Sequence, residues 1–149
     1  MDARNVVPPA AKLRPEPGAA TALGATLAAH GTHFAIYSRH ATRMTLALFA
    51  PGGAPRGELP LDPKHNRTGD IWHVFVPGVH AGAEYGWHAD SEAKGPEHAF
   101  EPDALLLDPH AKGVAGSERW AERTRHGRVL RGVVCDLSYD WGDDRPPAT

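Results

Sequence analysis

The most constraining feature of this sequence is a period-two alternation of apolar and polar side chains between about residues 21 and 90. It runs in short stretches separated by turn-forming residues. Successive strand side chains point to opposite faces of a sheet, so each stretch predicts a strand with one buried face. The residues expected to share the core face are Phe34, Ile36, Met44, Leu46, Leu48, Val74 and Val76. No stretch longer than about ten residues has helical periodicity, so the pattern favours an all-β sandwich over an α/β fold.

Turn-forming residues divide this region. The run 51–55 (PGGAP) predicts a tight turn, a short strand is expected around 57–61, and 62–70 reads as a polar loop. In the stretch 71–76 the residues on both faces of the expected strand are apolar, except His73. This pattern is typical of a strand that is covered on both faces.

Alternation returns at 83–89, and a late strand is expected within 129–135. Between them, 103–107 could form one helical turn with Asp103 as its N-cap, and 111–127 reads as a loop. The expected fold is therefore an immunoglobulin-like β-sandwich with a long irregular C-terminal segment.

Proline and glycine set the expected domain limits. Residues 1–17 contain four prolines and are expected to form a flexible lead-in, because proline removes a hydrogen-bond donor and fixes φ. The β-sandwich is expected to span 18–141, and 142–149 reads as a linker or tail. A chain of 149 residues is too short for a (β/α)₈ barrel, which needs about 250 residues.

Charge and cysteine content narrow the partners and the compartment. Sixteen Lys and Arg against eighteen Asp and Glu leave no basic surplus, which argues against nucleic-acid binding. No apolar stretch approaches 18 residues, so no membrane contact is expected, and the Ala-rich stretch 19–29 is interrupted and does not read as a signal peptide. A lone cysteine, Cys135, favours a reducing, cytoplasmic setting.

No catalytic, metal or cofactor site emerges from the polar residues. Ten histidines are scattered, and the closest pair, His30 and His33, would point to opposite faces of a strand. The adjacent acids Asp143 and Asp144 lie in a Pro-terminated tail and read as solvated turn residues. No serine has the Gly-x-Ser-x-Gly setting of a nucleophile elbow.

Aromatic rings are the candidate carbohydrate-binding residues. Tyr85 and Trp87 share one strand face and Trp72 lies on a neighbouring strand, so their flat rings could stack on sugars. The alternative is plain core packing, which large aromatics often serve in small domains. Trp72 has the parity of Val74 and Val76, so it is expected in the core. Tyr85 and Trp87 share a face with small neighbours only, and of these two Tyr85 is expected in the core and Trp87 is expected to be exposed.

Five motifs in order resemble a known family. They are LGAT at 23–26, THFAIYSRHATRMTLALF at 32–49, IWHVFVPGVHAGAEYGW at 71–87, FEPDALLLDPHAKGVAG at 100–116 and VVCDLSYDWGDDRPP at 133–147. Together they resemble the N-terminal module of isoamylase-type glycogen debranching enzymes, over about residues 20–147.

This resemblance implies an early-set β-sandwich classed with family-48 carbohydrate-binding modules. In the family it precedes a family-13 glycoside hydrolase barrel that cleaves α-1,6 branches and contains the catalytic carboxylates, so no catalytic residue is carried over. The expected function is a non-catalytic α-glucan-associated module whose partners are an α-glucan and a separate glycosidase barrel. Two alternatives stay open: an interaction sandwich without sugar affinity, and part of a debranching glycosidase whose barrel lies outside this sequence.

Overall fold

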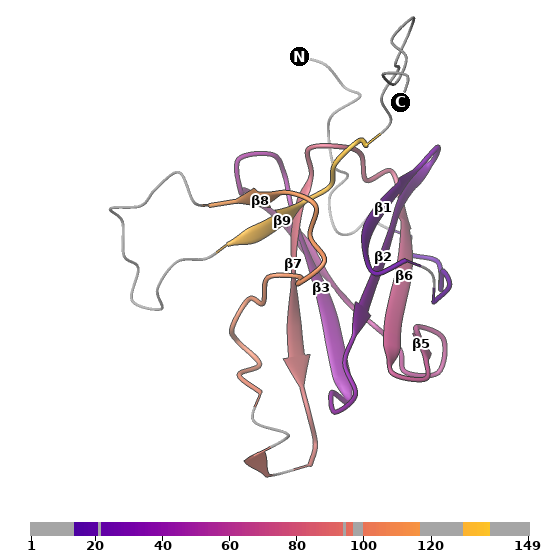
Figure 1. Ribbon diagram of the computed structural model, residues 1–149, viewed down its shortest axis with the longest axis vertical. Coiled ribbons are helices and arrows are strands. Elements are labelled where there is room, and N and C mark those ends of the chain that lie inside the picture. The colour runs from indigo at the N-terminus through magenta and orange to yellow at the C-terminus, as the bar shows by residue number, and fades with distance from the viewer. Residues whose placement is uncertain (1–13, 21, 94, 97–99, 117–129, 138–149) are drawn as a thin grey trace, which may run out of the picture.

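Two antiparallel sheets face each other in the computed structural model, which describes residues 14–20, 22–93, 95–96, 100–116 and 130–137 (Figure 1). The first sheet has the order β1 (Gly24–Ala28), β2 (Gly31–Tyr37), β6 (Ile71–Pro77), β5 (Arg67–Thr68). The second has the order β4 (Pro55–Pro60), β3 (Arg43–Phe49), β7 (Glu84–Asp90), β9 (Arg131–Val133), β8 (Val114–Ala115). No helix occurs in the described residues, and the expected all-β sandwich is confirmed.

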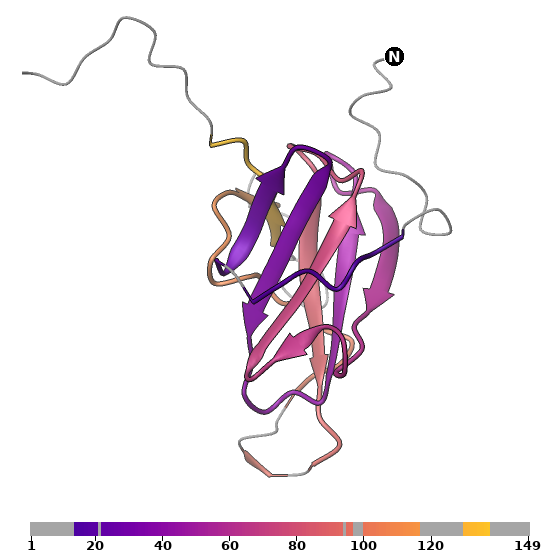
Figure 2. The same ribbon diagram turned by 90° about the vertical axis from the view of Figure 1, so that its right-hand side faces the viewer.

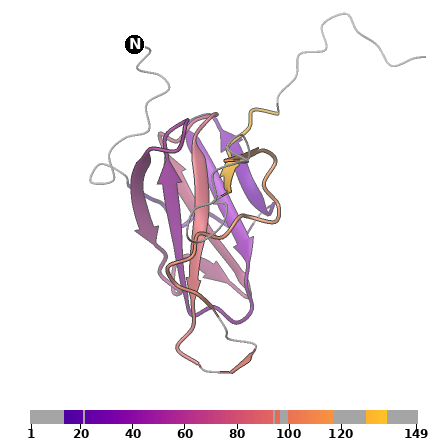
Figure 3. The ribbon, with the colours of Figure 1, turned by 90° about the vertical axis from the view of Figure 1, so that its left-hand side faces the viewer.

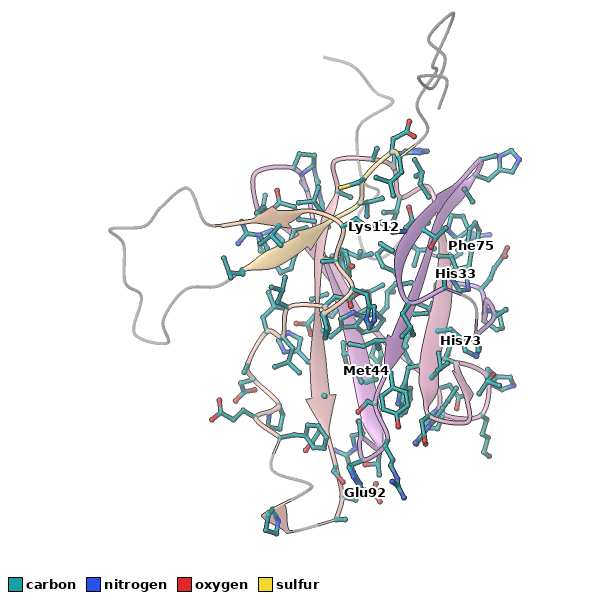
Figure 4. All side chains as sticks on the ribbon, viewed as in Figure 1. His33, Met44, His73, Phe75, Glu92 and Lys112 are labelled. Atoms are coloured by element: carbon teal, nitrogen blue, oxygen red, sulfur yellow. The ribbon has the colours of Figure 1, made fainter. Side chains whose placement is uncertain are left out.

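The core lies between the sheets and follows the expected parity. In the first sheet Phe34 pairs with Val74, and in the second Leu48 pairs with Tyr85, so these four side chains meet between the layers. The rings of Phe34 and Tyr85 pack edge to face with centroids 4.9 Å apart. All seven residues predicted for the core are buried, and Met44 is seen between the sheets in Figure 4.

The expected turn at 51–55 joins β3 to β4 and depends on glycine. Gly52 and Gly53 both have φ of 95°, a conformation that residues with a Cβ rarely adopt. The turn is closed by hydrogen bonds from Gly53 N–H to Ala50 O (2.9 Å) and from Ala50 N–H to Ala54 O (2.8 Å).

Three local expectations are corrected. The expected loop 62–70 contains the two-residue strand β5, and part of the expected loop 111–127 forms β8. The helical turn expected at 103–107 is wrong. Instead Leu106 exchanges backbone hydrogen bonds with Trp87 (2.7 and 3.0 Å), because the edge of β7 offers this segment unpaired donors and acceptors. Figure 3 shows the segment 100–116 passing over β7.

The end of the expected lead-in pairs with the first sheet. Residues 14–20, here called the strap, cross the outer face of β6 and β2 (Figure 2). Glu16 forms two backbone hydrogen bonds with Phe75 (2.7 and 2.9 Å). The strap accounts for the apolar character of β6 on both faces. Residues 1–13 and 138–149 lie outside the described residues.

Candidate functional site

The three aromatic rings expected to bind carbohydrate are buried. Trp72, Tyr85 and Trp87 are each 0% exposed, so the expected burial of Trp72 and Tyr85 is confirmed and the expected exposure of Trp87 is wrong. A sugar cannot reach the face of any of these rings in this structure.

Parity explains this correction. Trp87 pairs with Leu46 and Trp72 with Ile36, so both indoles face the space between the sheets. The small neighbours of Trp87 on this face, Ala83 and Ala89, do not cover its ring. The opposite sheet covers it, so Trp87 is completely buried. Both indole N–H groups are buried without a hydrogen-bond partner, which marks these positions as packing sites rather than polar recognition sites.

A buried hydrogen bond ties the segment after β7 to the core. The Tyr85 hydroxyl donates to Asp108 Oδ2 (2.8 Å), and the other oxygen of Asp108 accepts from His110 N–H (2.9 Å). Burial, followed by the nearby Asp108 charge, raises the pKa of Tyr85 well above its ordinary value of 10.0, so the phenol remains a donor. Gly132 lies against the Tyr85 ring, where a side chain would clash.

A second buried interaction holds β9 to β7. Arg131 Nε donates to Glu84 Oε1 (2.7 Å), and these side chains are only 16% and 6% exposed. Glu84 Oε2 also accepts from Gly52 N–H (2.7 Å), which joins the β3–β4 turn to the same carboxylate. Both interactions are structural, since neither faces an opening.

Two histidines lie beneath the strap on the outer face of the first sheet. His73 Nδ1 donates to Pro17 O (2.7 Å), and its Nε2 shares a hydrogen bond with the Thr68 hydroxyl (2.8 Å). His33 Nε2 accepts from Ala19 N–H (2.9 Å), so this nitrogen must be unprotonated. Burial, followed by the neighbouring His73, lowers the pKa of His33 below its ordinary value of 6.5. Figure 4 shows both imidazoles on this outer face.

One aromatic side chain that was not selected from the sequence is exposed on this face. Tyr37, the last residue of β2, is 56% exposed, and its partner in the register is Ile71, which in turn pairs with Thr68. The signal was present in the sequence, because Tyr37 has the parity opposite to Phe34 and Ile36.

A pocket of about 180 Å³ opens where the strap meets the chain between β4 and β5. Its lining residues are Pro15, Glu16, Pro17, Pro60, Leu61, Asp62, His65, Asn66 and Val74. The Asp62 carboxylate is already hydrogen-bonded within its own loop, where it accepts from Lys64 N–H (2.9 Å) and from His65 Nδ1 (2.7 Å). None of its lining residues is Phe, Tyr or Trp, the flat rings expected to stack on sugars.

The described residues contain neither a candidate metal site nor a membrane-spanning helix. In that part of the chain, no group of three or more His, Cys, Asp or Glu side chains could hold a metal ion. The same residues contain no helix with the length and apolar character needed to cross a membrane.

Comparison with protein families gives a direct result. Residues 22–111, more than half of the chain, match the model of carbohydrate-binding module 48, the isoamylase N-terminal domain. The chain belongs to this family. The family-48 module is also similar to the glycogen debranching enzyme of Serratia proteamaculans, with 38% identity over 89% of this chain and 21% of the enzyme. The enzyme of Cronobacter sakazakii is 35% identical over 83% of this chain and 20% of its own length. The module thus spans about a fifth of the curated relatives it matches.

Solved structures share the fold at lower identity. The pullulanase SAP of Group B Streptococcus matches with a TM-score of 0.58 and 16% identity, over 78% of this module and 15% of that chain. A Paenibacillus barengoltzii pullulanase variant complexed with maltotriose matches with a TM-score of 0.56 and 21% identity, over 86% of this module and 17% of that chain. These likenesses support the immunoglobulin-like sandwich.

Proposed function

We propose that this family-48 module is a non-catalytic, α-glucan-associated domain that works in cytoplasmic glycogen debranching. It would act beside a catalytic barrel, carried either by a separate protein or by a longer chain. The observation that carries this proposal is the 38% identity to a glycogen debranching enzyme over nearly the whole module and only 21% of the enzyme.

The described geometry fits a supporting role. Its most buried polar contacts, Tyr85 with Asp108 and Glu84 with Arg131, hold loops and strands together. Of the two acids that line the pocket, Glu16 and Asp62, the Asp62 carboxylate already accepts hydrogen bonds within its own loop. Glycoside hydrolysis needs two carboxyl groups placed about 5–10 Å apart across a bound sugar. In this proposal the catalytic step belongs to the barrel and glucan association to the module.

Two measurements on the purified module test this proposal. Affinity electrophoresis in gels with and without glycogen should show retardation by glycogen but not by dextran of similar size. A reducing-end assay on the same glycogen should stay at the buffer blank. Turnover that survives repurification and disappears when an acid of this chain is mutated would contradict the non-catalytic role.

A second candidate is an interaction sandwich with no sugar affinity, and the burial of Trp72, Tyr85 and Trp87 favours it. It predicts unchanged mobility in glycogen gels together with binding to a debranching enzyme from which the N-terminal module has been deleted. Retardation by glycogen without such binding would decide for the glucan-associated domain.

A further inference from the structure

Tyr37 stands apart from the other described aromatic residues. Its side chain is 56% exposed, whereas Phe34, Trp72, Tyr85 and Trp87 are completely buried. The remaining described rings, those of Phe49, Phe75 and Phe100, are half-buried. Tyr37 therefore offers the most open aromatic surface in the part of the chain that the structure describes.

The surroundings of Tyr37 form a short row across the outer face of the first sheet. The register places Ile71 beside Tyr37 and Thr68 beside Ile71, on three neighbouring strands. Strands in a sheet lie about 4.8 Å apart, so the row extends over roughly 10 Å. Tyr37 and Ile71 supply apolar surface, and the exposed Thr68 supplies a hydroxyl group.

Asp70, which directly precedes Ile71 in the chain, carries a carboxylate at the end of this row. The turn that carries Asp70 is fixed beside the end of β2, because Asp70 O accepts from Ser38 N–H (2.8 Å). The Asp70 side chain is 42% exposed, and its Oδ1 lies 3.5 Å from Arg67 Nη2. This carboxylate is thus paired with a partly buried cation and remains partly exposed to solvent.

The strap leaves this end of the face uncovered. Its hydrogen bonds go to Phe75, His73 and His33, which lie at least two residues away from Tyr37 and Ile71 along their strands. The outer face is therefore divided into a part crossed by residues 14–20 (Figure 2) and a part around the exposed Tyr37 that the strap does not contact.

We propose that Tyr37, Ile71, Thr68 and Asp70 form a stacking site for an α-glucan chain. The Tyr37 ring and Ile71 would cover the C–H face of a glucosyl unit, since an aromatic side chain combines an apolar face with a polar edge. The Asp70 carboxylate would accept charge-assisted hydrogen bonds from sugar hydroxyls. The Thr68 hydroxyl, which is already hydrogen-bonded to His73 Nε2, would accept a hydrogen bond from a neighbouring sugar hydroxyl. This site rests on the proposed glucan association and gives it a location.

Two variants with a matched control test the site. Tyr37→Ala should weaken retention in glycogen gels by roughly tenfold, the scale of losing one stacked ring, and Tyr37→Trp should retain or strengthen it. Leu137→Ala, which shortens another exposed apolar side chain (66% exposed), should leave retention unchanged. Melting temperatures of all three should stay close to that of the unmodified module.

A direct readout complements the variants. In methyl-labelled module, maltoheptaose should shift the Ile71 methyl signals, and cellohexaose at the same concentration should not. Asp70→Asn should weaken maltoheptaose binding several-fold, because it removes the charge from the hydrogen-bond acceptor.

The outcomes separate this site from the proposed function. If the unmodified module is retained by glycogen and Tyr37→Ala is retained equally, the site is overturned while glucan association stands. If the unmodified module shows no retention, both are overturned. If sedimentation shows a dimer that Tyr37→Ala dissociates and maltoheptaose leaves Ile71 unshifted, the patch is a contact between two copies and the glucan site is overturned.

Discussion

Trp87 offers the sharpest test of the structure, because the sequence left its role open between core and sugar platform. Its ring is completely buried opposite Leu46, so Trp87→Ala removes the side chain and leaves a cavity between the sheets. Truncation of a buried Phe or Trp to Ala costs about 3–5 kcal/mol. For a domain of this size each kcal/mol lowers the melting temperature by about 3–5 °C, so a decrease of roughly 9–25 °C is expected.

Thermal melts followed by circular dichroism measure this decrease, and Trp87→Phe provides the matched control. The Phe variant keeps most of the apolar ring and removes an indole N–H that is buried without a partner, so its cost should be well below that of Ala. Tyr37→Ala, at an exposed position, should melt close to the unmodified module. The burial argument is refuted if Trp87→Ala melts within about 2 °C of the unmodified module but loses glycogen retention.

Three further predictions concern buried polar and close-packed positions. Arg131→Met should lower the free energy of unfolding in urea by about 3 kcal/mol, because it leaves the Glu84 carboxylate buried without its cation, and adding Glu84→Gln should recover part of this loss. Because burial lowers the pKa of His33, the stabilising contribution of its neutral form is complete above pH 6.5 and is lost as the pH falls below that value. Between pH 7.5 and 5 the melting temperature should therefore fall more steeply in the unmodified module than in His33→Gln, whose amide oxygen can still accept a hydrogen bond from the strap. Gly86→Ala should cost about 1–3 kcal/mol, because its Cβ would lie 2.5 Å from Leu105 Cδ1, and a melt unchanged by this substitution would show that Leu105 moves freely.

Period-two patterning was sufficient to predict most of the sandwich. The three stretches with a regular alternation of side chains, now β2, β3 and β7, are strands whose apolar side chains face the core. The physical reason is that one-sided burial fixes both the strand and its register. The edge strand β1 has mostly small side chains and escaped this pattern, because its pairing depends on backbone hydrogen bonds to β2.

The candidate site was harder to predict, because parity identifies a face but not what covers it. Tyr85 and Trp87 share a face whose other members, Ala83 and Ala89, are small, so the rings could equally well have been open or enclosed. Only the position of the opposite sheet decides between these states. Tyr37 had the parity of a solvent-facing residue, yet the sequence alone did not show that the strap would stop short of it.

The strap itself shows how distant segments escape local patterns. The apolar character of β6 on both faces, interrupted only by His73, indicated a covering element but not its identity. That element is the proline-rich lead-in, more than fifty residues upstream. Pro15 and Pro17 lack N–H groups, so the strap can form only a single bridge to the sheet, through Glu16, and no continuous strand. The Pro17 carbonyl still accepts a hydrogen bond from His73. A polar residue therefore interrupts the otherwise apolar strand because its side chain donates the hydrogen bond that fixes the strap on this face.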